Sequence, residues 1–215
     1  MNRPVILLGA GGHAKVLLDM LRSTGREVKG ILIPEREHWG KDIWGIPVVG
    51  GDERINDYRP GDIEIVNGIG SVGDASIRIK VFTDMKRKGF QFATVIHPSA
   101  IIAGDVSIGE GVQVMAGAVI QPGCRIGENV IVNTGVIIDH DCRIEDHVHL
   151  APGVVLSGEV NIGSKTHIGT GASVIQGVTV GGSALIAAGA VIVSDIPEDV
   201  LASGIPARIV EQKRI

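Results

Sequence analysis

Residues 102–197 read IAGDVS IGEGVQ VMAGAV IQPGCR IGENVI VNTGVI IDHDCR IEDHVH LAPGVV LSGEVN IGSKTH IGTGAS VIQGVT VGGSAL IAAGAV IVSDIP, which is sixteen six-residue blocks without an interruption. The first position of every block is Ile, Val or Leu, and the fifth is Val, Ala, Cys, Thr or Ile. Positions two to four are rich in the turn-forming residues Gly, Asp, Asn and Pro. A short strand and a turn repeated every six residues predict a β-solenoid, because neither the helical period nor the alternation of a longer strand fits.

Three such hexads form one triangular coil, so residues 18 apart are predicted to stack at roughly 4.8 Å, the spacing of paired strands. Several identities recur at that offset: residues 124–126 read Cys-Arg-Ile and so do residues 142–144, and His149 precedes His167 by one coil. The interior of the prism is narrow, which explains why position five stays small. Both cysteines occupy position five, so we expect each to point inward.

The composition changes along the chain and indicates two domains. All Trp, Tyr and Phe residues of the 215-residue chain lie before residue 93. We therefore predict an α/β domain at 1–95, a β-helix at 96–197 and a C-terminal tail at 198–215. Two cysteines are too few for a disulfide-stapled fold, and a net charge of −4 argues against a nucleic-acid partner. No apolar run is long enough for a bilayer and no secretory signal opens the chain, so no membrane association and a cytoplasmic location are expected.

The N-terminal region predicts a strand, a Gly-rich turn and a helix in succession. Residues 5–8 are apolar, residues 9–15 read GAGGHAK, and residues 16–21 have a helical apolar period. Gly11 and Gly12 would let backbone N–H groups approach a diphosphate at the helix N-terminus, although the glycines could also serve only a tight turn. Strands at 28–33 and 63–69 and a helix at 75–88 would complete a small Rossmann-like βαβ domain. A domain of this size suits a nucleotide sugar better than NAD.

Four motifs carry a resemblance that covers essentially the whole chain. They are GAGGHAK at 9–15, His-Pro-Ser-Ala at 97–100, Asp-His-Asp at 139–141 and Gly-Ile-Pro-Ala at 204–207. Together they resemble the bacterial nucleotide-linked amino-sugar N-acetyltransferases of the bacillosamine and perosamine type, which are related to sialic-acid O-acetyltransferase-like proteins. The resemblance implies left-handed winding of the solenoid, which the repeat alone does not determine.

The resemblance also implies where the substrates bind. It predicts a homotrimer in which the N-terminal domain holds the nucleotide diphosphate and acetyl-CoA lies in the groove between neighbouring β-helices. The general base falls on His140, supported by Asp141, and an acetyl-CoA contact near the thioester falls on His149. Further acetyl-CoA contacts fall on Thr170 and Ala188, one coil apart.

For the nucleotide sugar, the resemblance and the strand ends indicate His13, Glu35 and Gly70 beside the two glycines of the Gly-rich turn. His13 could touch a phosphate or simply cap the helix. Gly70 follows a strand at the edge where the crevice of a parallel sheet opens. Members that use a UDP-sugar carry an acidic pair where this chain has Pro-Glu at 34–35, so UDP, GDP and dTDP all stay open.

The chemistry of His140 has alternatives. It occupies position three of its hexad, in a turn, between two carboxylates that would stabilise its imidazolium and fix its tautomer, as a general base requires. A solvated turn histidine would fit the same pattern. A metal site with His147 and His149 is a second alternative, but no His pair has the expected spacing, so no metal is predicted. A nucleophilic Cys142 is disfavoured by its inward register. Asn133 is a possible support for the base or the substrate.

We therefore predict an N-acetyltransferase that moves acetyl from acetyl-CoA directly to the C4 amine of a nucleotide-linked 4-amino-4,6-dideoxy sugar. The resemblance implies that the product is used in surface-polysaccharide biosynthesis. Three alternatives remain at this stage: a sialic-acid-type O-acetyltransferase, a zinc-dependent hydratase, and a non-catalytic sugar-nucleotide-binding protein.

Overall fold

The computed structural model describes residues 3–212, which form two compact units divided between Pro98 and Ser99. The predicted fold class, a small Rossmann-like α/β domain followed by a left-handed parallel β-helix, is confirmed. The unit boundary lies three residues beyond the predicted end of the first domain.

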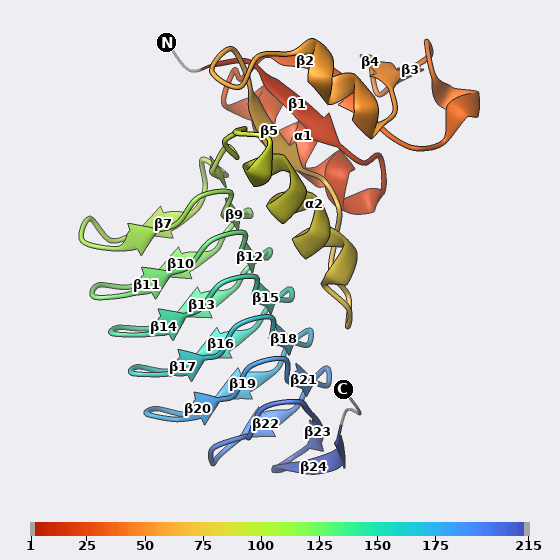
Figure 1. Ribbon diagram of the computed structural model, residues 1–215. Coiled ribbons are helices and arrows are strands. Elements are labelled where there is room, and N and C mark those ends of the chain that lie inside the picture. Colours follow the sequence, from red (N-terminus) through yellow and green to blue (C-terminus); the bar gives the residue numbers. More distant parts are fainter. Residues whose placement is uncertain (1–2, 213–215) are drawn as a thin grey trace. The chain divides into compact units, whose positions relative to one another are not determined.

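The first unit is a sheet of order β3-β4-β2-β1-β5 with its helices (Figure 1). Strands β1, β2, β4 and β5 are parallel, and β3 pairs antiparallel with β4. Buried aliphatic side chains of β1 and β5 pack with Phe82 and Met85 of α2, which explains why the aromatic residues are confined to this unit. The elements are β1 (Val5–Leu8), α1 (Gly12–Ser23), β2 (Val28–Leu32), the 3-10 helix η1 (Arg36–His38), β3 (Asp42–Ile43), β4 (Ile46–Gly50), the 3-10 helix η2 (Asp52–Asp57), β5 (Glu64–Asn67), α2 (Ser76–Arg87) and β6 (Val95–Ile96).

The second unit stacks two-residue strands into the three faces of a prism (Figure 1). Face 1 consists of β7 (Ile101–Ile102), β10 (Val119–Ile120), β13 (Ile137–Ile138), β16 (Val155–Leu156), β19 (Ser173–Val174) and β22 (Val191–Ile192). Face 2 consists of β8 (Ser107–Ile108), β11 (Arg125–Ile126), β14 (Arg143–Ile144), β17 (Asn161–Ile162) and β20 (Thr179–Val180). Face 3 contains β9 (Gln113–Val114), β12 (Ile131–Val132), β15 (His149–Leu150), β18 (His167–Ile168), β21 (Leu185–Ile186), β23 (Val200–Gly204) and β24 (Ala207–Gln212).

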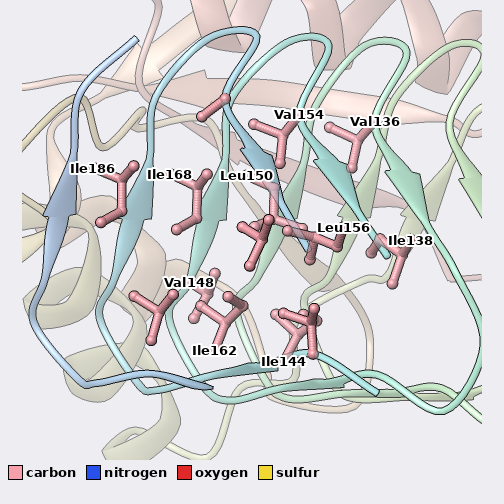
Figure 2. Close-up of a cluster of buried hydrophobic side chains, with 14 of the residues drawn as sticks. Val136, Ile138, Ile144, Val148, Leu150, Val154, Leu156, Ile162, Ile168 and Ile186 are labelled. Carbon is pink, nitrogen blue, oxygen red and sulfur yellow. The ribbon is translucent and has the colours of Figure 1, made fainter. Parts of the chain in front are cut away.

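The strand register is the predicted one, with partners 18 residues apart, as in Ile120↔Ile138 and Ile126↔Ile144. Hexad position one is the inward residue of each strand, and Ile138, Leu156 and Ile162 are fully buried there. Position five also points inward, so that Val136, Val148 and Val154 fill the space between the faces (Figure 2). Branched aliphatic side chains at two positions in six therefore form one continuous core.

Turns join the faces along three edges, which we call the first edge (between faces 1 and 2), the second edge (faces 2 and 3) and the third edge (faces 3 and 1). Position four of the hexad commonly has a left-handed backbone conformation. On the third edge this residue is glycine in every coil from 117 to 189. On the first edge, the acidic residues Asp141 (φ 60°) and Glu159 (φ 61°) have this left-handed conformation. The left-handed turn thus projects acidic side chains along the first edge.

The C-terminal end of the solenoid departs from the repeat. Ile196 bridges Val180, which is 16 rather than 18 residues away. Residues 198–212, which the sequence assigned to a separate tail, belong to the second unit: β23 continues face 3 beside β21, and β24 folds back antiparallel on β23. Buried Val200, Ala202 and Ala207 extend the core, which is why this segment packs on the last coil.

Candidate active site

The His140 turn, residues 139–141, lies on the first edge of the prism. The Nδ1 atom of His140 is 2.9 Å from Oδ2 of Asp141, and the backbone N–H of His140 donates to Oδ1 of Asp139 at 2.8 Å. The side chain of His140 is 47% exposed, so a substrate can reach it. The turn is joined to both neighbouring coils, because Asp141 N–H donates to the carbonyl of Pro122 and Glu159 N–H donates to that of His140.

The electrostatics of this turn suit a base. A carboxylate can only accept a hydrogen bond, so Nδ1 carries the proton and Nε2 is the basic nitrogen. The pKa of His140 is raised, chiefly by the hydrogen bond to Asp141; desolvation opposes this effect, and the charges of Asp139, Asp141 and Glu159 add to it. The arrangement can therefore accept a proton at Nε2 and hold the resulting imidazolium.

Gly158 lies directly against this ring, one coil further along the chain. A Cβ atom at position 158 would lie 2.5 Å from both Cε1 and Nε2 of His140. Only glycine at position 158 allows the imidazole of His140 to occupy its observed position. Gly158 was not among the predicted site residues, although its 18-residue offset from His140 places it in the adjacent turn.

His149 has a different environment on face 3. Its Nε2 is 3.2 Å from Nδ2 of Asn133, and its ring meets that of His167 edge-on at 4.7 Å between centroids. Oδ1 of Asn133 accepts the N–H of Thr134, so Nδ2 is the donor and Nε2 of His149 the acceptor. Asn133, predicted as a possible support for the base or the substrate, contacts His149 in the structure.

Thr170 and Ala188 lie in turns of the third edge, and both are exposed. The N–H of Gly189 donates to the carbonyl of Thr170 at 2.8 Å, which links the two turns directly. The structure thus brings these two residues together in adjacent coils. It places them on a different edge from His140, and the described part of one chain does not gather the base and these positions into one pocket.

The Gly-rich turn of the first unit leads into α1, whose N-cap is Gly11. A Cβ at Gly11 or Gly12 would meet nothing within 4 Å, so the helix N-terminus is open to a ligand. A Cβ at Gly70 would lie 3.6 Å from Cβ of His13, so the loop after β5 adjoins the start of α1. The structure brings these four residues together at the carboxyl edge of β1 and β5.

Three further residues belong to this edge of the sheet. Glu35 follows β2 and is exposed. Asp52 follows β4, and its pKa is raised by partial desolvation and by Glu53. Arg78 of α2 is buried and donates to the carbonyls of Asn67 (3.0 Å) and Ile69 (2.7 Å), while burial lowers its pKa to about 9, which keeps it charged at neutral pH. Arg78 thereby holds the loop that contains Gly70; the apolar period of the helix gave no signal for it.

A hollow of about 610 Å³ lies on face 2 and extends to the turns of the second edge. Arg125 and Arg143 stand in register on β11 and β14, and Asn161 and Thr179 continue the lining. Gly127, Gly163 and Gly181 occupy hexad position two and have no side chains that would fill the hollow. The repeated Cys-Arg-Ile of the sequence thus places two exposed arginines side by side on face 2, a consequence that the repeat alone did not indicate.

Among residues 3–212, no cluster of three or more His, Cys, Asp or Glu side chains is arranged to hold a metal ion. His147 instead has Nδ1 3.1 Å from Nδ2 of Asn129 on the second edge. Both cysteines are buried, as their register predicted. No helix within the described range is long and apolar enough to cross a membrane.

A hexapeptide-repeat solenoid with an exposed His-Asp pair on one edge, preceded by a small α/β domain, defines a hexapeptide acyltransferase. Comparisons with known proteins agree. Residues 4–85 match the PglD N-terminal domain, and residues 105–139 and 123–158 match the bacterial transferase hexapeptide family (six repeats). No match was found among curated protein sequences.

Solved structures match nearly the whole chain. A histidine-to-asparagine mutant of perosamine N-acetyltransferase from Caulobacter crescentus, in complex with CoA and GDP-perosamine, is 39% identical over 97% of both chains, with a TM-score of 0.89. The acetyltransferase domain of PglB from Neisseria gonorrhoeae, in complex with acetyl coenzyme A, is 37% identical over 98% of this chain and 100% of that one, with a TM-score of 0.89. WeeI from Acinetobacter baumannii is 25% identical over 97% and 100%, with a TM-score of 0.80. The chain belongs to the family of acetyl-CoA-dependent N-acetyltransferases that act on nucleotide-linked amino sugars.

Proposed function

We propose that this chain transfers the acetyl group of acetyl-CoA to the C4 amine of a nucleotide-linked 4-amino-4,6-dideoxy sugar. The observation that carries the proposal is the exposed His140 with its Nδ1 fixed by Asp141, on the edge of a hexapeptide solenoid. The relatives with bound CoA, acetyl-CoA and GDP-perosamine support the two substrate classes.

The reaction needs no covalent enzyme intermediate. As the amine nitrogen attacks the thioester carbonyl, Nε2 of His140 accepts its proton and Asp141 stabilises the imidazolium. The new C–N bond forms, the C–S bond breaks, and the departing sulfur takes the proton from His140 to leave as the CoA thiol. A backbone N–H of an adjacent coil would stabilise the oxyanion between these steps.

A homotrimer would complete this site. Face 1 lies between the first and third edges, and its outward residues are apolar in five of six coils: Ile101, Val119, Ile137, Val155 and Val191, with Ser173 as the exception. Face 2 instead presents Ser107, Arg125, Arg143, Asn161 and Thr179. If three copies bury face 1 around a common axis, the first edge of one copy adjoins the third edge of the next. His140 would then face Thr170 and Ala188 of its neighbour across a groove for acetyl-CoA, and His149, positioned by Asn133, would border that groove.

The first unit would hold the nucleotide diphosphate at Gly11, Gly12 and His13, with Glu35 and Gly70 beside the sugar nucleotide. Both substrates carry phosphates, and Arg125 and Arg143 supply positive charge on the face next to His140. We place the reaction in the cytoplasm, where acetyl-CoA is available, and its product in surface-polysaccharide biosynthesis.

The decisive test measures release of the CoA thiol from acetyl-CoA with UDP-, GDP- and dTDP-linked 4-amino-4,6-dideoxy sugars and with a sialic acid as hydroxyl acceptor. We expect at least one amino sugar to be acetylated and His140→Ala to lower its rate by about 100-fold or more, the usual share of a general base. Inert amino sugars, or an unchanged rate in the variant, would contradict the proposal. Turnover of the sialic acid alone would identify an O-acetyltransferase.

A further inference from the structure

The two cysteines of the chain lie on the first edge, Cys124 one coil before His140 and Cys142 in the turn of His140 itself. Position five after the first-edge turn reads Val106, Cys124, Cys142, Val160 and Val178. Valine occupies this interior site in the other coils of the series. Burial alone does not explain the exchange, because Val160 and Val178 are buried as the two cysteines are.

The thiols differ from valine in what they bind. Sγ of Cys124 donates to the carbonyl of Asp139 at 3.0 Å, and Sγ of Cys142 donates to the carbonyl of Ser157 at 3.2 Å. Asp139 immediately precedes His140, and Ser157 immediately precedes Gly158, against which the ring of His140 lies. Each thiol thus holds one of the two backbone segments that determine the position of the imidazole.

The third edge shows how such carbonyls are otherwise satisfied. There the carbonyls of Asn133, Ala151 and Gly169 accept the N–H three residues ahead in the same turn, at 3.1 to 3.3 Å. For Asp139 and Ser157, the donor recorded within residues 3–212 is the thiol from the preceding coil. A buried carbonyl that loses its donor is costly, so the turn would move to find another partner.

From this arrangement we infer that Cys124 and Cys142 are positioning residues for the general base, acting through the carbonyls of Asp139 and Ser157. The inference rests on the proposed function for its catalytic meaning, but the geometric effect on His140 is independent of turnover. Because a carbonyl oxygen can only accept, each thiol makes this contact in its protonated form.

The test replaces each cysteine by valine, the residue that the other coils use, and by serine, which keeps a donor. We expect Cys124→Val to lower the unfolding temperature no more than the Thr166→Val control does, while kcat falls by about tenfold, because a small displacement of the base is sufficient to slow the reaction. The KM for each substrate should change less than kcat. Cys124→Ser should recover part of the loss, and Cys142→Val should act in the same direction.

Thr166→Val is the matched control. Oγ1 of Thr166 donates to the carbonyl of Gly181 at 2.7 Å from the same hexad position, but on the second edge. This variant should lose stability and keep the kcat and the pH profile of the wild type.

An NMR titration of the His140 ring gives a readout that does not depend on catalysis. Valine variants should shift its ring resonances and its pKa, and serine should restore them. If the valine variants keep wild-type kcat and wild-type His140 resonances, or if Thr166→Val changes them equally, the inference is wrong. If the wild-type protein acetylates no amino sugar but the resonances still respond, the proposed function fails while the positioning role stands.

Discussion

The imidazole of His140 packs against the backbone of Gly158, 18 residues further along the chain, with no room for a methyl group between them: a Cβ at 158 would lie 2.5 Å from Cε1 and Nε2. Gly158→Ala must therefore displace the ring from its place beside Asp141. We expect kcat to fall on the order of 100-fold, because the base no longer points at the amine. Steady-state kinetics with both substrates would measure it.

A control for this variant is available on the same edge. Gly104 occupies the same hexad position as Gly158, in the first-edge turn two coils before His140, and a Cβ there would meet nothing within 4 Å. Gly104→Ala should keep wild-type activity and folding. Equal activity of the two alanine variants would show that the ring does not need the space above Gly158.

Replacement of Asp141 by asparagine changes the charge next to His140 while keeping the left-handed turn, which asparagine tolerates. The pKa of His140 is raised chiefly by the hydrogen bond to Asp141, so Asp141→Asn should lower that pKa. The base must be neutral to accept a proton, so activity appears as pH rises through this pKa, and the acidic limb of kcat/KM should move to lower pH. The plateau should fall by about tenfold, because a weaker base accepts the proton less readily.

A pH–rate profile of wild type and variant would measure both effects. Asp139 and Glu159 still raise the pKa in the variant, so the limb should shift without disappearing. An acidic limb at the same pH in both proteins would assign the observed ionisation to another group.

The hexad register explains how far the sequence could predict this molecule. A period of six with inward positions one and five is a local rule, and it correctly predicts that Cys142 lies inside the prism and that His140 lies in a surface turn. The same rule stacks Thr170 and Ala188. The hexad rule does not predict hydrogen bonds between a side chain of one coil and the backbone of the next, because these depend on which carbonyl lacks a backbone donor. The hydrogen bond from the thiol of Cys124 to the carbonyl of Asp139 is one such contact.

The N-terminal domain was less accessible to sequence reasoning for a related reason. The Gly-rich turn has a recognisable spacing, so Gly11 and Gly12 could be identified. Arg78 could not, because a buried arginine contradicts the usual expectation for a charged residue on a helix and is explained only by the two carbonyls that it serves. A contact from the side chain of the following helix to the carbonyls of the loop has no local sequence signature.

Arg78→Met tests that positioning. The change removes two charge-assisted hydrogen bonds from the loop that contains Gly70, and we expect the first unit to lose about 2–3 kcal/mol of unfolding free energy. The KM for the nucleotide sugar should rise, whereas that for acetyl-CoA should stay. Arg87→Met is the control on the same helix, since Arg87 is 75% exposed and pairs only at the surface with Asp84. A similar KM in both variants would separate Arg78 from nucleotide binding.

Face 1 provides the test of the proposed assembly. Ile137 is 42% exposed in a single chain, and its neighbours on this face, Ile101 and Val155, are also apolar and exposed. Ile137→Glu would place a carboxylate from each copy at the proposed axis, where three like charges would be desolvated together. We expect light scattering to show dissociation of a trimer and the activity to fall at least about 100-fold, because His140 is separated from the acyl donor held by the neighbouring chain. Lys165→Glu, on the opposite second edge, should keep both the trimer and the activity. If Ile137→Glu stayed trimeric and active, face 1 would not be the contact, and the site would have to be completed in another way.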